Sequence, residues 1–400
     1  MNGYSKLAAL HRKRFAFIAL LMFIPALAAI LFTTQKVTQT REQTMNSKFG
    51  TMPPVTFIPS SRALLLPPQQ NLTPSATTTQ PSSFLRYPAN IDYERFTSYG
   101  TYNSAALSNA NIGAVDVNMN WAQVEPQQGA FNFAPADQEV AAWTAKGKKF
   151  TLIVRYTNEG TSGIDCSGIQ LLPSWEISRI QHFCDTDMGT LIPDYFDQTF
   201  KQDLKAYVEA IAVHFANGPY RDSLLYVRIG VGEGGEGFPY MSRGDYIVDK
   251  QRLVSFGYSP SAWAAWQEEM MTSFKALFSY TTVIYPLNGL DTDPTVGKPV
   301  QVEVATWVAS QGMGLGQQGL VPGTNSFLFQ SLHTQYPHMY IQYQTISAIS
   351  GGATEVQEDI QAADKNRACF IEWYTQDAIN TSYQSLLAQW QQMVDNRCRS

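Results

Sequence analysis

From residue 86 onward, apolar runs typical of buried strands alternate with helical patterns, and this alternation limits the fold more than any other feature. Examples are "KFTLIVRY" before "FKQDLKAYVEAIAVHFANG" and "LLYVRIGV" before "SPSAWAAWQEEMMTSFKALF". Strands that alternate with helices along a chain become parallel neighbours joined by crossover helices. The pattern therefore predicts an α/β fold.

Seven strands are clear, and we expect the eighth to be the first in the chain, "RFTSYGTY" near residue 95. The last four are "TTVIYPLNG", "GMGLGQQG", "HMYIQYQT" and "ACFIEWYTQ", and "PVQVEVATWVAS" is predicted to be a helix. This number of units predicts a (β/α)8 TIM barrel over residues 86–400, with functional residues at the carboxyl ends of the strands. A doubly wound sheet is the alternative, but the sequence has no GxGxxG fingerprint at a first strand-to-helix turn.

The residues before the barrel predict export. Basic residues precede an unbroken apolar run from Phe15 to Phe32, so we expect residues 1–33 to be a cytoplasmic basic segment and a hydrophobic anchor. A cleaved signal peptide is the alternative, because "ALA" at 26–28 offers small residues. Residues 34–85 are rich in Thr, Ser, Pro and Gln and predict a flexible linker, in which "RALLLPP" is apolar enough to dock. The barrel is then extracellular, either membrane-anchored or secreted.

The four cysteines fit an exported protein, in which disulfides persist. Bridges between Cys166 and Cys184 and between Cys369 and Cys398 are the simplest of three pairings, and buried free thiols are the alternative. No CxxC motif or nearby histidine pair supports a zinc site, and we expect neither a metal nor a cofactor.

Charge argues against nucleic acid as a partner. The formal net charge is -5, the pI is about 5.6, and no block of lysines or arginines occurs beyond the N-terminus. We expect a monomer that acts on a neutral partner.

One stretch carries a resemblance to a known superfamily. Residues 118–156, "NMNWAQVEPQQGAFNFAPADQEVAAWTAKGKKFTLIVRY", resemble the W-x-x-(V/L)-EP-x-x-G-x-(F/Y)-x-F segment of barrel glycoside hydrolases of the β-galactosidase, β-glucanase and xylanase superfamily, known as clan A. The resemblance implies a TIM barrel that hydrolyses O-glycosidic bonds of an oligo- or polysaccharide with two carboxylates and no cofactor. In that superfamily the acid/base glutamate follows the fourth strand, and the nucleophile glutamate ends the seventh.

The glycine-rich loop "GEGGEG" follows the expected fourth strand and carries two candidates for the general acid/base. We favour Glu236 over Glu233, because a Gly-Glu pair closing such a loop resembles similar exported barrels. The Asn-Glu pair that is familiar in the superfamily is replaced here by Gly-Glu pairs. An acidic glycine loop without a catalytic duty is the alternative interpretation.

Glu372, at the end of "ACFIEWYTQD", is the candidate nucleophile. This strand is the eighth, whereas the seventh offers Gln342 and Gln344, and glutamine cannot be a nucleophile. Three explanations stay open: the strand count is wrong, the chemistry has moved by one strand, or the barrel binds sugar without cleaving it. The rival function is therefore a non-catalytic carbohydrate-binding barrel at the cell surface.

Other polar and aromatic residues at strand ends are predicted to contact the sugar, although each alone is more often a solvated loop residue. Trp121 serves either as a sugar platform or in core packing, and the Glu125-Pro126 turn with Gly129 is interpreted as structural. The predicted contacts are Asn120, Trp121, Arg155, Asn158, Asn288, Gln344, Trp373, Tyr374 and Asp377, with Glu159, Gln317 and Gln318 as further contributors.

Overall fold

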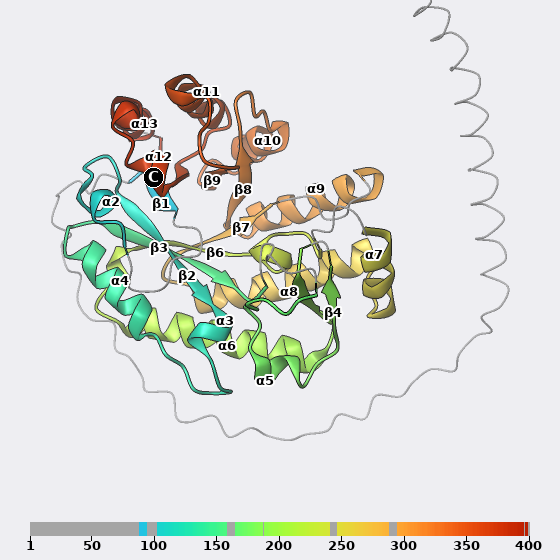
Figure 1. Cartoon of the computed structure of the whole chain (residues 1–400). Helices are drawn as coiled ribbons and strands as arrows, with labels where there is room; N and C mark the ends of the chain where they lie inside the picture. The colour runs from blue at the N-terminus through green and yellow to red at the C-terminus, as the bar shows by residue number, and fades with distance from the viewer. Residues whose placement is uncertain are drawn as a thin grey trace, which may run out of the picture. The chain divides into compact units, whose positions relative to one another are not determined.

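The structure is a computed structural model, and it describes residues 88–93, 102–157, 165–186, 188–240, 246–287, 294–395 and 397–398. All of them belong to one compact unit, Ser82–Ser400. They form a closed barrel of eight parallel strands (Figure 1) in the order β1-β10-β9-β8-β7-β6-β3-β2. The strands are β1 (Asn90–Tyr93), β2 (Ala114–Asn120), β3 (Lys149–Arg155), β6 (Leu224–Ile229), β7 (Thr282–Pro286), β8 (Gly314–Leu320), β9 (Ile341–Thr345) and β10 (Phe370–Tyr374). The predicted (β/α)8 barrel is therefore confirmed.

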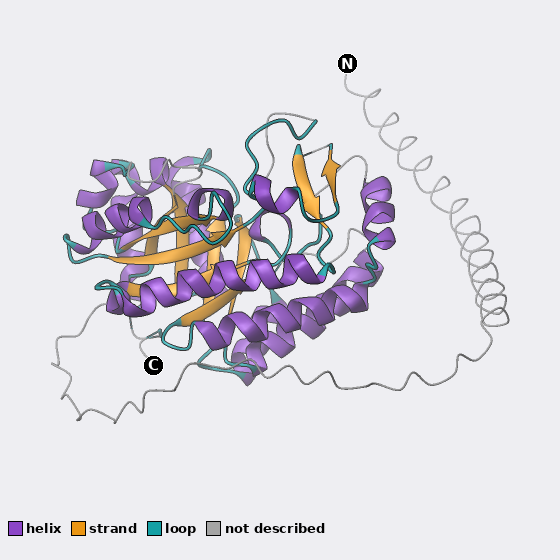
Figure 2. Cartoon of the chain, turned by 90° about the horizontal axis from the view of Figure 1, so that it is seen from below, coloured by secondary structure: helices purple, strands orange, loops and turns teal. Residues whose placement is uncertain are grey.

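Helices surround the strands (Figure 2), and the stretch predicted to be helical before β8 is α9. The helices are α2 (Ser104–Ser108), α3 (Trp121–Val124), α4 (Ala134–Thr144), α5 (Ser174–Ile177), α6 (Gln198–Asn217), α7 (Tyr246–Ser255), α8 (Pro260–Leu277), α9 (Pro294–Ser310), α10 (Phe327–Gln335), α11 (Gly352–Lys365), α12 (Thr375–Ala378) and α13 (Gln384–Val394). Short 3-10 turns occur at η1 (Arg221–Ser223), η2 (Glu233–Gly235) and η3 (Thr381–Tyr383).

The long helix α6 illustrates why these segments become helices. The Asp197 side chain accepts hydrogen bonds from the backbone N–H groups of Thr199 and Phe200, and so caps the first turn. One face then buries apolar side chains against the barrel at helical spacing. These side chains are Phe200, Leu204, Tyr207, Val208, Ile211, Ala212 and Phe215.

The first strand is not where the sequence pattern placed it. The barrel closes through "NIDY", Asn90–Tyr93, which pairs with both β10 and β2. Most of the predicted "RFTSYGTY" lies outside the described residues. The hydrophobic pattern misses this strand because β1 contains polar residues such as Asn90. Asn90 is nevertheless fully buried, and its side chain donates to the Leu387 carbonyl and accepts from the Trp373 indole N–H instead of bonding water.

The predicted anchor and linker, residues 1–85, also lie outside the described residues. Within the described ranges, no helix has the length and apolar character needed to span a bilayer.

Both predicted disulfides are present. Cys369, just before β10, is bonded to Cys398 beyond α13, with the two Cα atoms 5.7 Å apart. This bridge ties the last helix to the last barrel strand.

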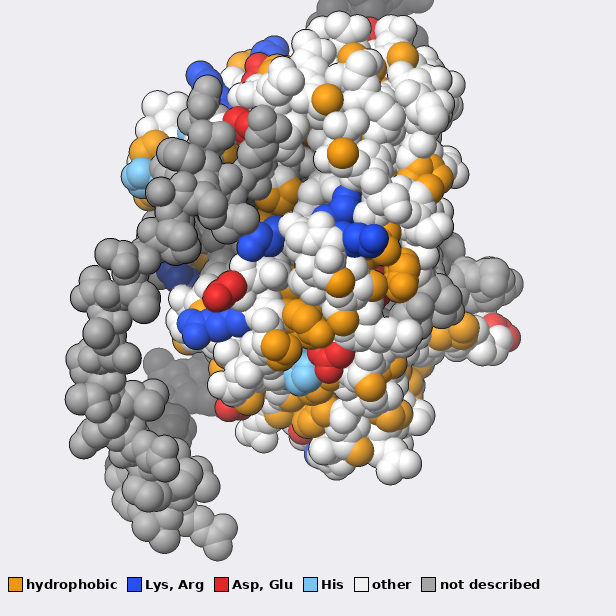
Figure 3. Space-filling view, turned by 90° about the vertical axis from the view of Figure 1, so that its left-hand side faces the viewer, with side chains coloured by type: hydrophobic (Ala, Val, Ile, Leu, Met, Phe, Trp, Pro, Cys, Tyr) orange, Lys and Arg blue, Asp and Glu red, His pale blue; other side chains and the backbone are white. Residues whose placement is uncertain are grey.

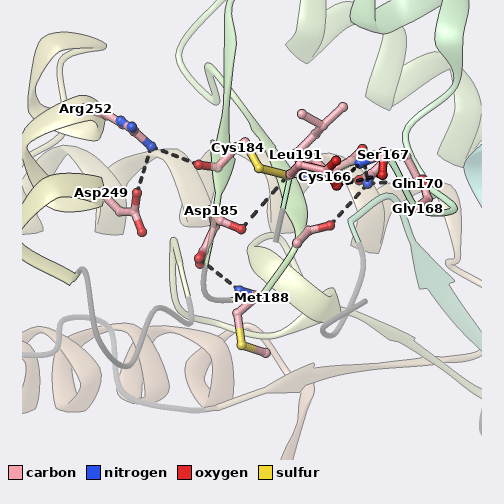
Figure 4. Close-up of a disulfide and its surroundings, with 12 residues drawn as sticks. Cys166, Ser167, Gly168, Gln170, Cys184, Asp185, Met188, Leu191, Asp249 and Arg252 are labelled. Atoms are coloured by element: carbon pink, nitrogen blue, oxygen red, sulfur yellow. Dashed lines mark hydrogen bonds and ion pairs between the residues drawn. A yellow bond between two sulfur atoms is a disulfide. The ribbon is translucent and has the colours of Figure 1, made fainter. Parts of the chain in front are cut away.

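The other bridge, Cys166–Cys184, lies in the segment between β3 and α6, of which residues 156–157, 165–186 and 188–197 are described. This segment carries an antiparallel hairpin, β4 (His182–Asp185) and β5 (Thr190–Pro193). Figure 4 shows how α7 holds this hairpin: Arg252 donates to the Cys184 carbonyl at 2.8 Å and pairs with Asp249 at 3.2 Å. The segments that follow β3 and β6 are thereby joined beside the barrel.

The loop after β6 is closed and hydrogen-bonded. The Gly232 N–H donates to the Glu236 carbonyl at 2.8 Å, and the Glu233 N–H donates to the Phe238 carbonyl at 3.1 Å. The Thr157 hydroxyl, at the end of β3, bonds both the Gly232 carbonyl and the Gly234 N–H. The acidic glycine loop is thus held in one backbone conformation.

Two of its glycines are required by the close approach of backbone to backbone. A Cβ atom at Gly230 would overlap the Gly235 carbonyl, and one at Gly232 would overlap the Phe238 carbonyl. Gly235 is needed for another reason, since its φ of 78° is a left-handed value that side chains disfavour. The glycines of this loop therefore permit a tight turn of the backbone, and they do not make the loop flexible.

Removing the Cys369–Cys398 bridge by a double serine substitution should lower the free energy of unfolding by about 3 to 4 kcal/mol, because the bridge closes a chain loop of 29 residues. Urea denaturation would show this as a lower midpoint with a similar slope. Removal of Cys166–Cys184 should mainly increase amide exchange in β4 and β5, since that bridge lies in the segment between β3 and α6. Equal losses of global stability on removal of either bridge would contradict the prediction.

Gly230→Ala should destabilise the protein by at least about 2 kcal/mol, because the added methyl group meets backbone that cannot move aside. Gly323→Ala is the matched control: its φ of 80° is strained, but its Cβ would meet nothing within 4 Å, so about 1 kcal/mol is expected. Thermal or urea unfolding compares the two. A smaller loss of unfolding free energy for Gly230→Ala than for Gly323→Ala would show that the backbone after β6 can shift to accommodate a side chain.

Candidate functional site

The centre of the barrel holds an ion pair between opposite strands. Glu372 on β10 accepts a hydrogen bond from the Tyr226 hydroxyl at 2.7 Å and one from Arg228 Nη1 at 2.7 Å. Both donors lie on β6, which is four places from β10 in the ring of eight strands. Arg228 and Glu372 are at most 1% exposed. The two side chains therefore meet across the barrel axis and out of contact with bulk water.

Arg228 also connects the strands on either side of Glu372. Its Nη1 donates to Gln344 Oε1 on β9 at 3.1 Å, and its guanidinium lies 5.8 Å from the centre of the Tyr93 ring on β1. Arg155, at the end of β3, donates to the Tyr93 hydroxyl at 2.8 Å. Two sequence-predicted residues, Arg155 and Gln344, thus belong to one polar cluster with Glu372.

A second carboxyl group adjoins this cluster. Asp116 on β2 is almost fully buried, and it accepts a hydrogen bond from the Thr151 hydroxyl on β3. Its carboxyl also lies within hydrogen-bonding reach of Glu372. The site therefore contains a carboxyl pair that the sequence did not reveal.

Burial and the neighbouring charges set the protonation of these groups. Burial raises the pKa of Asp116 well above its usual value, and the charge of Glu372 raises it further. Burial also raises the pKa of Glu372, although Arg228 and the Tyr226 hydroxyl counteract it. Burial alone would lower the pKa of Arg228, but the carboxylates around it raise it. Arg228 is therefore cationic at any physiological pH.

The two glutamates of the glycine loop lie in different surroundings, although each is at most 1% exposed. The charge of Glu236 acts on Arg228 and, less than burial does, on the pKa of Tyr285 on β7. The charge of Glu233 acts on Tyr195, whose ring packs against Trp263 and Trp266 of α8. The charge of Glu236 therefore acts on Arg228 at the barrel centre.

Glutamine amides line the barrel next to Arg228. Gln342, two residues before Gln344 on β9, is fully buried, and a Cβ atom at Gly316 on β8 would overlap its Oε1 atom. The absence of a side chain at Gly316 makes room for this amide. Sequence-predicted Gln317 and Gln318 continue the same strand and are partly exposed.

Two aromatic residues predicted as sugar contacts are buried in the core. Trp121 is fully buried, its indole N–H donates to Glu125 at 2.7 Å, and its ring stacks on Tyr207. Trp373 is fully buried and donates to Asn90. Strand alternation explains the latter, because Trp373 faces away from the axis that Glu372 faces. Neither ring can face a ligand in this conformation.

The "WAQVEPQQG" turn has the structural role that was expected. The Glu125 carboxylate joins Trp121 to the Gly129 backbone N–H at 2.7 Å, and Gly129 has a φ of 75°. Phe131 and Phe133 stack with ring centres 6.1 Å apart.

The remaining predicted contacts are scattered. Asn120 ends β2, and its side-chain amide donates to Gln123. Asp377 accepts a hydrogen bond from the Ile349 N–H, and this bond holds the segment after β9 in place. Tyr374 is partly exposed, and its ring meets Tyr93 edge to face at 5.4 Å. Asn158, Glu159 and Asn288 lie outside the described residues.

Tyr226, Arg228 and Asp116 were missed by sequence reasoning, although the strands carry a signal for them. In "LLYVRIG" and "AVDVNMN", polar residues recur at every second position of strands that are otherwise apolar. A strand buried on both faces has no solvent for such side chains, so they must face one another inside the barrel. Within the described ranges, no group of three or more His, Cys, Asp or Glu side chains is placed to hold a metal ion.

Comparison with known proteins supports the fold. No known family profile and no curated protein matches the chain. Among solved structures, the β-amylase catalytic domain from Paenibacillus polymyxa matches 78% of this chain and 98% of its own length, with a TM-score of 0.53 and 10% identity. Xylanase 10B from Thermotoga maritima matches 73% and 84%, with a TM-score of 0.42 and 11% identity. Xylanase 10B from Thermotoga petrophila RKU-1, in complex with xylobiose, matches 74% and 86%, with a TM-score of 0.45 and 11% identity.

At 10% identity, the likeness to the β-amylase domain shows a shared fold and no more. Together with the closed parallel barrel, it confirms the architecture that the resemblance implied. The chain folds as a closed (β/α)8 barrel, and it shares this fold with the β-amylase catalytic domain.

Proposed function

We propose that this protein binds a carbohydrate at the barrel mouth and hydrolyses an O-glycosidic bond, with Glu236 as general acid/base and Glu372 as nucleophile or stabilising carboxylate. The observation that carries the proposal is the position of Arg228. Arg228 pairs with Glu372 at 2.7 Å, and the negative charge of Glu236 also favours its cationic form. One carboxyl group, Glu372, contacts this guanidinium, and the charge of a second, Glu236 in the loop after the opposite strand, also acts on it. Glycosidases need two carboxyl groups on either side of the scissile bond.

Glu372 has the support that an anionic carboxylate requires. Tyr226 and Arg228 donate to different oxygens of its carboxylate, which fixes the orientation of the group. Each oxygen keeps a second lone pair, so attack on an anomeric carbon or stabilisation of an oxocarbenium ion stays open to it. The donors also favour the charged form against the effect of burial.

The surroundings fit a neutral ligand. Tyr374 offers a partly exposed ring beside Tyr93, and the glutamine amides of β9 are suited to hydroxyl groups. On the face drawn in Figure 3, Lys and Arg side chains form small, separate groups, several of them beside Asp or Glu side chains. These features favour an uncharged sugar over a polyanion.

A non-catalytic carbohydrate-binding barrel is the second candidate function, and a specific observation favours it. Glu372 is already engaged by two donors at 2.7 Å and is fully buried, which is also what a purely structural carboxylate shows. The seventh strand, β9, carries Gln342 and Gln344 at the positions where the superfamily has its nucleophile.

The same proposal includes export. Two disulfides fit an extracellular or secreted protein, because such bonds persist in oxidising compartments. We propose that the basic and apolar segment of residues 1–33 directs this export, either as an anchor or as a cleaved signal.

Glu236→Gln should abolish turnover of a natural glycoside that wild-type protein cleaves, found by screening a broad panel, because the amide cannot protonate the leaving oxygen. Sugar binding, measured by calorimetry, should stay close to wild type. An aryl glycoside with an activated leaving group should keep much of its glycosylation rate. Glu372→Gln should lose turnover of both substrates, because a better leaving group does not replace a nucleophile.

Glu233→Gln is the matched control, since it is an identical change in the same loop. The role passes to Glu233 if this variant is inactive and Glu236→Gln is fully active. Because Glu372→Gln leaves Arg228 buried without its partner, its folding must be verified, and Glu372→Gln with Arg228→Gln removes both charges if the single variant unfolds. Binding of panel sugars without any cleavage would favour the second function.

A further inference from the structure

We propose that Asp116 is a positioning residue that carries a proton at neutral pH and donates it in a hydrogen bond to Glu372. This inference rests on the proposed function for its effect on catalysis, but the shared proton itself does not. The protonated Asp116 would be a third donor to Glu372, beside Tyr226 and Arg228, and would complete its orientation.

The contact between the two carboxyl groups is the first step. Asp116 and Glu372 lie within hydrogen-bonding reach of each other on β2 and β10, the two strands that flank β1. Ionised carboxylates only accept hydrogen bonds, so such a contact is a bond only when one of the two carries a proton. Both groups are at most 1% exposed, so water cannot screen their repulsion if both are charged.

The donors around each group decide which one holds the proton. Glu372 accepts from a guanidinium and a phenol, both at 2.7 Å, which favours its anion. Asp116 accepts only from the Thr151 hydroxyl among the described residues, through Oδ1, and its Oδ2 atom accepts from no described donor. The less supported carboxyl takes the proton, which places it on Asp116.

The other charged groups agree with this assignment. Asp92 on β1 adds a negative charge that raises the pKa of Asp116, after the larger effects of burial and Glu372. Arg228 lowers the pKa of both carboxyls, and Arg155 on β3 lowers that of Glu372. Glu236 is the further carboxyl in the field of Arg228, and Tyr93 and Tyr226 are the phenols that face this centre. The balance favours a neutral Asp116 beside an anionic Glu372.

The variants follow from this geometry. Asp116→Asn imitates a protonated carboxyl, because its carbonyl accepts from Thr151 while its NH2 group donates to Glu372. Asp116→Leu removes both bonds. Asp359→Asn is the matched control: Asp359 on α11 is also buried, and burial with nearby Glu355 raises its pKa to about 7, but it lies outside the barrel cluster.

Infrared spectroscopy of the full chain tests the proton directly. At about pH 8, where Asp359 is mostly ionised, the carbonyl band of protonated carboxyls should lose the contribution of one group in Asp116→Asn and little in Asp359→Asn. An unchanged band in Asp116→Asn would overturn the proposal. This measurement needs no substrate, so it decides the proton even if no glycoside is ever cleaved.

Stability against pH gives an independent test. Because the folded pKa of Asp116 is raised, its stabilising contribution is complete below the unfolded pKa of about 3.9 and is lost as pH rises through the folded pKa. Asp116→Asn lacks this loss, so its stability relative to wild type should increase steadily with pH above about 4. A relative stability that stays constant or falls with pH would count against the proposal.

Activity then tests the positioning role. Asp116→Leu should lower kcat about tenfold or more with little change in KM, and Asp116→Asn should restore most of it. In Asp116→Asn, the fall of activity at high pH that Asp116 ionisation causes should be reduced, whereas Asp359→Asn should keep the wild-type profile. Equal losses in Asp116→Asn and Asp116→Leu would overturn the positioning role. If Asp116→Leu does not fold, the altered profile of Asp116→Asn decides alone.

Discussion

The ion pair between Arg228 and Glu372 is the interaction around which the barrel interior is organised. Moving two charges out of water costs several kcal/mol for each ion, and the cost is offset only if the remaining donors and acceptors are satisfied. Tyr226, Gln344 and Asp116 help to satisfy them from three different strands. A barrel with an apolar centre would need none of these residues, so their presence points to a function for the centre beyond stability.

The same strand that supplies Arg228 also sets the position of Glu236. The chain leaves β6 at Gly230 and reaches Glu236 through a turn that Thr157 and two backbone hydrogen bonds fix. The relation between Glu236 and the Arg228–Glu372 pair is therefore built into a short stretch of backbone with little freedom. Preorganisation of this kind is what a site for acid/base chemistry requires.

The sequence predicted the barrel well because strand and helix periodicity are local properties, and most of its strands, such as β3 and β6, follow apolar runs. It missed "NIDY" because Asn90 and Asp92 are polar, and only partners distant in the chain make their burial possible. The same reason hid Arg228 and Asp116 as members of the site. Trp373 was misassigned because its direction depends on alternation relative to Glu372, which the residue type does not reveal.

The arrangement of charges also bears on what the barrel can bind. With Asp116 neutral, Arg228 and Glu372 cancel, and the centre of the barrel has no excess charge from these three groups. An ionised Asp116 would add an uncompensated negative charge at a buried position, where it would repel Glu372 and compete for Arg228. Three groups that balance electrically and still offer donors and acceptors suit a ligand that is itself neutral and covered with hydroxyl groups. The placement of one proton is thus part of the case for a carbohydrate.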